Sequence, residues 1–330
     1  MVHIDRITTE VEIEALTPEW RALWRRIPTA TPFQSPEWLL SWWSCYGNTP
    51  PSVVAAYEDD RLIGLLPLYV RDEPGCRKLL PFGISLSDYL DALIDPGYPE
   101  LENTLLEGLS VVPGWDECHL PDLPPGGALA TARCPSAFSE DRSDGETCPV
   151  LRLPSVVERL RDVVPHQTLR YLRRARQRAA SSGGVTVTKA ENSTVGSCMG
   201  ELFRLHERRW RRAGGQGVCA DPIVRAFHLT AAARLSDAGM LRLYLLRIGD
   251  LPAAAYYGFT ANKTAYAYLS GFDPDSAELC PGAQIIAYAI EEAVREGIRE
   301  FHFLRGGEAY KYSWGALDRP NITRTLRLRC

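Results

Sequence analysis

Residues 299–311, REFHFLRGGEAYK, are the stretch from which the fold of this chain is most directly read. Arg299–Leu304 is rich in bulky β-formers and predicts a strand. The residues before it, Gln284–Gly297, predict a helix. After the strand come two glycines with an acid, a phenol and amine or guanidinium groups, and Trp314 follows closely. A strand that runs straight into such a cluster indicates chemistry presented at a sheet edge.

Length and composition set limits on the class of protein. A chain of 330 residues with a net charge of −4 predicts two domains and argues against a generally basic nucleic-acid binder. The first residues contain no apolar signal segment, and no apolar run is long enough to span a bilayer. The nine cysteines are scattered without a C-x-x-C pair. We therefore expect a cytoplasmic protein with reduced thiols, no metal and no membrane contact.

Two halves of the chain show the same order of elements. Residues 51–70 and 241–259 each predict a β-hairpin, and a helix followed by a strand comes later in both halves, at 99–120 and 284–304. This echo predicts an α/β fold with mixed sheets in two duplicated domains, 1–165 and 166–330, with extra basic helices between them. The alternative is a chance match of common α/β elements.

Two predicted helices are strongly basic. Residues 169–178 contain five arginines and no acid, so the helix lacks the opposite charges that usually pair along a helix face. A bound anion would relieve this repulsion, which makes Arg170 and Arg173 candidates for substrate binding; a solvated helix face is the alternative. In the second helix, His206 and Trp210 lie one turn apart and could share a pocket wall, although a core role for Trp210 is the simpler interpretation.

A loop between a strand and a helix supplies a candidate anion site. A strand ends near Ser270 and Gly271, and Pro281, Gly282 and Ala283 open the next helix. Proline suits a first helical turn, glycine permits close backbone approach, and free amides at a helix start bind phosphate.

Together these residues resemble the GNAT acyltransferases, specifically the CelD/BcsL branch of cellulose biosynthesis, which is similar to the FemAB aminoacyltransferases. The resemblance spans roughly residues 30–315 and rests on five phrases: 31–38, 170–176, 205–210, 268–273 and 303–311. It implies tandem GNAT-like domains, in agreement with the echo. It also implies that the strands before and after the helix at 284–297 splay apart to admit the acyl arm of a donor.

The resemblance also implies roles for individual residues. Ser270, Gly271, Pro281, Gly282 and Ala283 would hold the donor, although this loop keeps only one of the usual glycines. The catalytic residues would be Glu308 as general base, Tyr310 as proton donor, Lys311 as oxyanion partner and Asp273 as a site for the acceptor amine. Arg305 and Trp314 would join Arg170, Arg173, His206 and Trp210 in binding substrate. The structural alternative is a Glu308–Lys311 or Arg305–Glu308 ion pair that closes a turn, with Tyr310 covering the core.

These observations predict an N-acyltransferase that moves an acyl group from acyl-CoA to an amine or hydroxyl of a small molecule. Because the donor loop is eroded and the helices are basic, aminoacyl-tRNA is the alternative donor, with tRNA then a partner. A further alternative is a non-catalytic protein that binds an anion or RNA on a degenerate GNAT fold.

Overall fold

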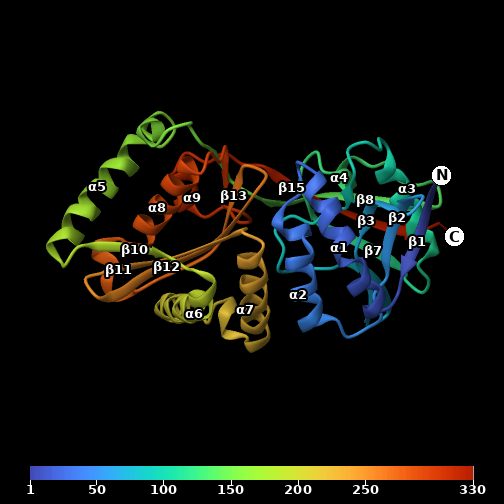
Figure 1. The fold of residues 1–330 in the computed structure, drawn as a ribbon, viewed down its shortest axis with the longest axis horizontal. Coiled ribbons are helices and arrows are strands. Elements are labelled where there is room, and N and C mark those ends of the chain that lie inside the picture. Colours follow the sequence, from blue (N-terminus) through green and yellow to red (C-terminus); the bar gives the residue numbers. More distant parts are fainter. Residues whose placement is uncertain (330) are drawn as a thin grey trace. The chain divides into compact units, whose positions relative to one another are not determined.

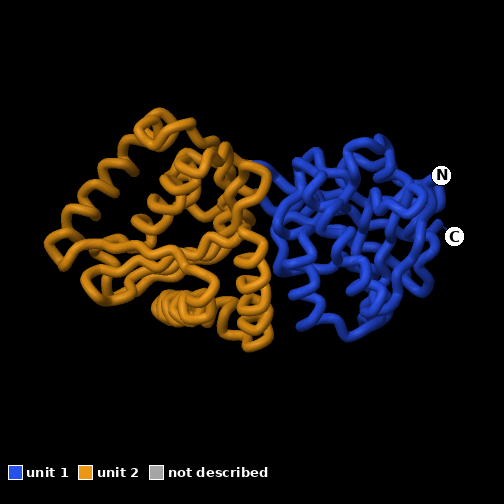
Figure 2. The backbone as a smooth tube through the Cα atoms, viewed as in Figure 1, with its two compact units in different colours: residues 1–147, 319–330 blue, residues 148–318 orange. Residues whose placement is uncertain are grey.

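The computed structural model describes residues 1–329 and divides them into two compact units (Figure 2). The first unit contains residues 1–147 and the C-terminal segment from Arg319, and the second contains residues 148–318. The units therefore end at residues other than 165 and 166.

Strand pairing explains where the units end. β9 (Val150–Arg152) pairs with β14 (Glu300–His302), so the chain already belongs to the second unit before residue 165. β15 (Pro320–Leu328) pairs with β7 (Glu117–Leu123) and β8 (Phe138–Thr147), so the C-terminal strand completes a sheet of the first unit. Both pairings join residues far apart in sequence, which a local pattern does not reveal.

The first unit contains two sheets. One has the order β1-β2-β3-β6, with β1 (Val2–Ile7), β2 (Val53–Glu58), β3 (Arg61–Leu66) and β6 (Leu93–Ile94). The other has the order β4-β5-β7-β15-β8, with β4 (Leu68–Glu73) and β5 (Cys76–Pro81). The helices are α1 (Glu10–Arg26), α2 (Pro36–Tyr46), α3 (Leu101–Glu107) and α4 (Ala128–Thr131), with the 3-10 turns η1 (Pro32–Gln34) and η2 (Gly108–Val111). The predicted hairpin at 51–70 is β2 and β3, and the predicted strand near 117 is β7.

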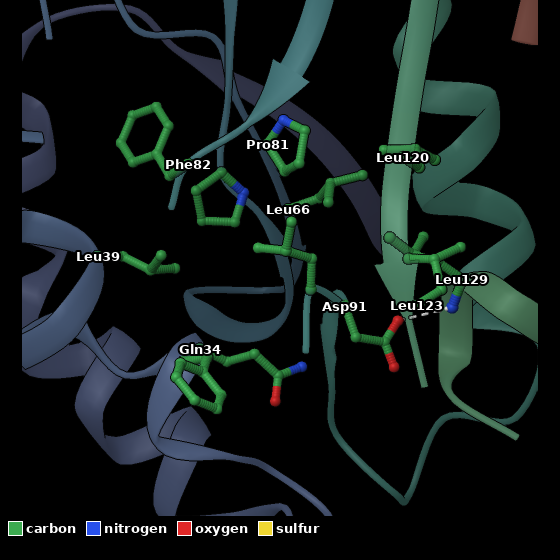
Figure 3. Close-up of a pocket in the computed structure, with 12 residues that line it drawn as sticks. Gln34, Leu39, Leu66, Pro81, Phe82, Asp91, Leu120, Leu123 and Leu129 are labelled. Atoms are coloured by element: carbon green, nitrogen blue, oxygen red, sulfur yellow. Dashed lines mark hydrogen bonds between the residues drawn. The ribbon is translucent and has the colours of Figure 1, made fainter. Parts of the chain in front are cut away.

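The first unit has a small cavity whose wall includes Gln34 and Asp91 (Figure 3). Its volume of about 10 Å³ is room for about one water molecule. The Asp91 carboxylate accepts hydrogen bonds from the amides of Ala128 and Leu129, each at 2.8 Å, and so caps the start of α4. Burial raises the pKa of Asp91 to about 6 against the opposing effect of these amides. This cavity is too small to hold a substrate.

The second unit is built on one sheet of order β10-β11-β12-β13-β14-β9. Its further strands are β10 (Val185–Lys189), β11 (Leu241–Ile248), β12 (Leu251–Ala261) and β13 (Thr264–Phe272). The helices are α5 (His166–Ser181), α6 (Val195–Arg212), α7 (Pro222–Asp237), α8 (Pro281–Arg295) and α9 (Ala309–Tyr312), with η3 (Val157–Asp162), η4 (Asn192–Thr194), η5 (Val218–Ala220) and η6 (Pro274–Leu279). The α/β class with mixed sheets is confirmed: each unit combines antiparallel strands with a parallel pair, β5–β7 in the first and β13–β14 in the second.

Helices cover both faces of this sheet: α5 and α8 lie on one face, and α6 and α7 lie on the other (Figure 1). Alternation along β12 explains why, because successive side chains of a strand point to opposite faces. Tyr256 packs with Tyr244 and the apolar residues of α8, while Tyr257 contacts His228 of α7 at a ring-centroid distance of 5.6 Å. The second unit is therefore a three-layer structure.

An arginine in β15 ties the first unit together. Arg324 is fully buried; its Nε donates to Glu140 of β8 and its Nη1 to the carbonyl of Leu129 in α4. Arg327 on the same strand also pairs with two carboxylates, Glu117 and Asp141, but keeps 45 % of its side chain exposed. Both arginines therefore bind oxygen acceptors on neighbouring elements, but Arg324 is buried and Arg327 is half exposed.

Arg324→Met is expected to lower the free energy of unfolding of the first unit by about 3 kcal/mol, because the Leu129 carbonyl loses its buried donor and Glu140 keeps only the half-exposed Arg142 as a partner. The matched change Arg327→Met is expected to cost much less, because exposed ion pairs contribute little to stability. Urea unfolding of both variants measures the difference. Equal losses would show that burial of Arg324 does not set its contribution.

Candidate active site

The strands β13 and β14 separate after a short parallel ladder. The ladder has three pairs, from Thr264–Glu300 to Tyr266–His302, although β13 itself continues to Phe272. A β-bulge lies just beyond the last pair: Tyr257 of β12 pairs with Leu269 and Gly258 with Ala267, which leaves Tyr268 as the extra residue. A bulge bends the strand that carries it. The end of β13 therefore diverges from β14 as the resemblance implied.

Gly271 brings the end of β13 directly against α6. A Cβ at this position would lie 2.4 Å from the backbone nitrogen of His206, a distance at which the strand and helix would have to separate. Glycine is therefore required for this contact. The contact fixes the position of Ser270 and Phe272 relative to α6, and both residues line a cavity.

The start of α8 lies beside the same strand end. Pro281 occupies the first helical turn after Cys280, and no side chain caps the helix. A Cβ on Gly282 would lie 3.1 Å from the Phe272 ring, so the glycine lets the helix start approach β13. The uncapped amides of this turn suit an anion.

A cavity of about 800 Å³ joins these elements within the second unit. It is lined by Pro165, Gln167, Thr168, Arg170, Tyr171, Arg174, Arg178, Arg209, Ser270, Phe272, Gly282, Ala283, Ile286, Tyr310, Ser313 and Trp314. Four of these residues are arginines, and none of the described lining residues is acidic. The cavity therefore suits a ligand with several negative charges.

Three of the arginines form a row on α5. Arg170, Arg174 and Arg178 are four residues apart, so they recur on one side of the helix at intervals of about 6 Å. Arg178 also donates to the carbonyl of Glu278 at 3.1 Å and lies 3.5 Å from the sulfur of Cys280, which brings the row to the start of α8. Arg170 and Arg174 make no ion pair with any described residue.

The fourth arginine comes from the opposite face of the sheet. Arg209 of α6 places its guanidinium 5.3 Å from the centre of the Phe272 ring, a cation–π contact at the end of β13. Its helix neighbour Arg208 is instead fixed by two carboxylates, Asp273 at 2.8 Å and Asp275 at 2.7 Å. Arg209 thus reaches the cavity without a carboxylate partner among the described residues.

Tyr310 and Trp314 form another wall. Trp314 is buried in the core of the second unit, while 42 % of Tyr310 remains accessible. Partial burial and then the charge of Glu308 raise the pKa of Tyr310 to about 12, and Arg209 opposes this effect. Tyr310 therefore carries its proton at neutral pH.

Lys311 is held in an oxygen cage below this wall. Its buried ammonium donates to the carbonyls of Leu304 at 2.9 Å, Arg305 at 2.5 Å and Gly306 at 3.1 Å, and pairs with the Glu308 carboxylate at 2.9 Å. Leu304 has a φ of 61°, which is unfavourable for a branched side chain, so the turn needs such support. The Glu308–Lys311 ion pair considered from the sequence is present, and neither residue lines the cavity.

Other predicted residues lie away from the cavity. Asp273 caps η6 and pairs with Arg208. The buried His206 accepts a hydrogen bond at 2.9 Å from Trp210, whose ring is partly exposed. Arg173 lines a separate groove of about 530 Å³ on the other side of α5.

The remaining predicted residues stay close to the site without forming its wall. Arg305 contributes its carbonyl to the Lys311 cage. Gly271 and Pro281 act through the backbone, as packing positions beside Ser270 and Gly282. The neighbouring His302 is buried in β14, and its Nε2 lies 3.2 Å from the Glu300 carboxylate.

Sequence reasoning missed several lining residues. Arg174 and Arg178 carried a usable signal, because they repeat Arg170 at intervals of four, whereas Arg173 is off that row. No signal in the sequence distinguished Arg209, because arginines occur on all sides of the end of its helix. Phe272 and Tyr171 also escaped notice because a lone aromatic gives no direction of its own.

Comparison with known proteins agrees with this geometry. Residues 166–312 match the family model described as an acetyltransferase (GNAT) domain, while no curated protein matches the sequence. The fold is that of the GNAT superfamily. The general prediction of a GNAT-type acyl or aminoacyl transferase is confirmed. The CelD/BcsL branch, the donor and the acceptor stay predictions.

Solved structures extend the likeness to both units. A FemX structure is 12% identical over 99% of this chain and 97% of its own, with a TM-score of 0.69. A tandem GNAT protein from the clavulanic acid biosynthesis pathway is 13% identical over 98% of each chain, with a TM-score of 0.52. A domain of a putative lysylphosphatidylglycerol synthetase from Agrobacterium fabrum is 13% identical over 80% of each chain, with a TM-score of 0.54. At these identities the likeness shows the fold, and it confirms the tandem GNAT-like arrangement.

Residues 1–329 contain neither a cluster of metal-ligating side chains nor a helix suited to span a membrane. No group of three or more His, Cys, Asp or Glu side chains is arranged to hold a metal ion. Within the same residues, no helix combines the length and hydropathy needed to cross a membrane.

Lys311→Met is expected to lower the free energy of unfolding of the second unit by about 3 kcal/mol, because three carbonyls lose their buried donor. Glu308→Gln should cost less than about 1 kcal/mol, since 59 % of that side chain is exposed. Thermal and urea unfolding provide the measurement. A Lys311→Met protein with the wild-type midpoint would contradict the structural role of the cage.

Stability should also fall in mild acid because of His206. Burial chiefly lowers its pKa from 6.5 to about 4, so below pH 6.5 the unfolded chain takes up a proton that the folded chain refuses. Stability is then lost as the pH falls from 6.5 towards 4, by up to about 3 kcal/mol. Urea unfolding between pH 4.5 and 7.5 should show a shallower slope for His206→Gln, which can still accept from Trp210. The exposed His166→Gln serves as control, and an unchanged slope in His206→Gln would refute the assignment.

Proposed function

We propose that the second unit transfers an acyl group from a phosphate-bearing activated donor to an amine or hydroxyl of a small molecule. The observation that carries this proposal is the cavity of about 800 Å³ with four arginines and no acid, located where β13 leaves β14. A GNAT-type cleft needs a place for donor phosphates and room at the strand end for the acyl arm. The arginines of the cavity and its lining by Ser270 and Phe272 at the end of β13 support this assignment.

The donor phosphates would bind between α5 and α8. The row of Arg170, Arg174 and Arg178 supplies charge, and the first-turn amides at Gly282 and Ala283 supply oriented donors. Guanidinium groups bind phosphate through paired hydrogen bonds. The acyl carbonyl would then lie near Ser270, where backbone amides at the end of β13 would polarise it.

The reaction itself would depend mainly on proximity. The acceptor nitrogen or oxygen attacks the carbonyl carbon, and the bond from that carbon to the donor sulfur or oxygen breaks. Tyr310, protonated at neutral pH, would give its proton to the leaving group and would recover one from solvent. The acceptor's proton would pass to a water molecule. Glu308, which lies outside the cavity wall, would then accept a proton from that water.

Lys311 and Asp273 receive supporting roles in this proposal. Because the Lys311 ammonium is engaged by three carbonyls and Glu308, it would hold the turn that carries Tyr310 instead of contacting an oxyanion. Asp273 would fix the loop before α8 through Arg208. His206 would act through its backbone contact with Gly271.

Acyl-CoA is our first proposal for the donor, and aminoacyl-tRNA is the second. The second is favoured by the arginines that continue beyond the cavity, since Arg173 and Arg176 line the groove on the other side of α5. A polynucleotide could contact both sides of the helix, whereas acyl-CoA needs only the cavity. Titration calorimetry with acetyl-CoA, longer acyl-CoAs and deacylated tRNA, followed by transfer assays with the donor that binds, decides between them. Binding of none of these donors would refute the proposed function.

Arg174→Met and Arg178→Met are each expected to weaken binding of the donor by about tenfold, because each removes a charge-assisted contact to phosphate. Arg173→Met is the matched control: it makes the same change on the same helix but outside the cavity, and for acyl-CoA it should alter the affinity by less than about twofold. Calorimetry measures all three affinities. Equal losses would show that α5 acts only as a diffuse positive field.

A further inference from the structure

Arg209 stands apart from the other three arginines of the cavity. Arg170, Arg174 and Arg178 all belong to α5, which shares one face of the sheet with α8. Arg209 belongs to α6, which lies on the opposite face of the sheet (Figure 1). Its side chain lines the cavity and contacts Phe272 at the end of β13. The cavity therefore presents positive charge from two directions, one on either side of the diverging strand.

The surroundings of Arg209 also differ from those of three other arginines on α6. Arg204, Arg208 and Arg211 each pair with a carboxylate at 2.5–2.8 Å. Arg209 instead stacks on Phe272 and makes no ion pair with any described residue. Stacking holds a guanidinium in place while its edge stays available for paired hydrogen bonds to an oxyacid. This is the arrangement expected of a side chain that binds a ligand.

Arg209 also lies close to the reacting end of the cavity. It lines the cavity together with Ser270 and Tyr310, the two residues assigned above to the acyl carbonyl and the leaving group. Its charge acts on Tyr310, where it opposes the rise in the phenol pKa. The site proposed above for the donor phosphates lies between α5 and α8, so we assign an anion beside Arg209 to the molecule that approaches from the other direction.

We infer that Arg209 binds an anionic group of the acceptor, so that the acceptor is an amine or alcohol bearing a carboxylate or phosphate near its nucleophile. The inference rests on the proposed transfer reaction and adds the substrate class to it. Arg209 is thus a specificity-determining residue. A neutral acceptor would leave its charge uncompensated in the cavity, which disfavours binding.

The test compares acceptors that differ only in the anion. Glycine is paired with glycinamide for the carboxylate arm, and phosphoethanolamine with ethanolamine for the phosphate arm. Binding is measured by calorimetry on the full chain, with and without saturating coenzyme A or deacylated tRNA, so that the result does not depend on turnover. The anionic member of at least one pair should bind about tenfold more tightly to wild type.

Variants of Arg209 assign the preference to this side chain. Arg209→Met should abolish it, and Arg209→Lys should keep part of it because the charge remains without the planar fork. Arg212→Met, an exposed position on the same helix outside the cavity, is the matched control and should behave as wild type. Donor affinity should be unchanged in Arg209→Met.

Three outcomes would overturn the inference: no anionic member binds more tightly than its neutral partner, the preference survives in Arg209→Met, or Arg209→Met weakens the donor as much as Arg174→Met does. The last outcome would assign Arg209 to the donor. Failure of the proposed function looks different, because acceptor binding would then persist while no donor supported transfer.

Discussion

The site depends on the point at which the ladder between β13 and β14 stops. Three parallel pairs hold the strands together, and the bulge at Tyr268 then turns β13 away. The close contact of Gly271 with α6 keeps the diverging strand end in position. Two parts of the cavity wall contact this strand end directly, because α8 starts against Phe272 and Arg209 stacks on the same ring.

The positive side chains around this gap have two different environments. Arg170, Arg174 and Arg178 of α5 line the cavity in a row, and Arg170 and Arg174 have no ion-pair partner among the described residues. The Lys311 ammonium instead donates hydrogen bonds to backbone carbonyls of one turn. A guanidinium beside an open cavity attracts a ligand, and an ammonium enclosed by carbonyls fixes a fold. Positive charge is therefore left open to a cavity in one place, and in another it holds the turn that precedes Tyr310.

Local patterns in the sequence predicted the elements well and the site in part. Both hairpins, the helix before β14 and the basic helix α5 follow from periodicity and turn residues. Of the predicted site, Arg170, Ser270, Gly282, Ala283, Tyr310 and Trp314 line the cavity. Lys311 and Asp273 do not, because an ammonium and a carboxylate look the same in a sequence whether they meet a ligand or their own neighbours. The role inferred for Arg209 could not be predicted from the sequence. It depends on the contact with Phe272 and on the lack of a carboxylate partner among the described residues, and both are tertiary features.

The return of β15 to the first unit has a consequence for how the chain is made. β15 sits between β7 and β8, and its buried Arg324 joins β8 to α4. All of residues 148–318 leave the ribosome before this strand does. The unit whose synthesis begins first is therefore completed last, because its sheet cannot close until β15 has been made.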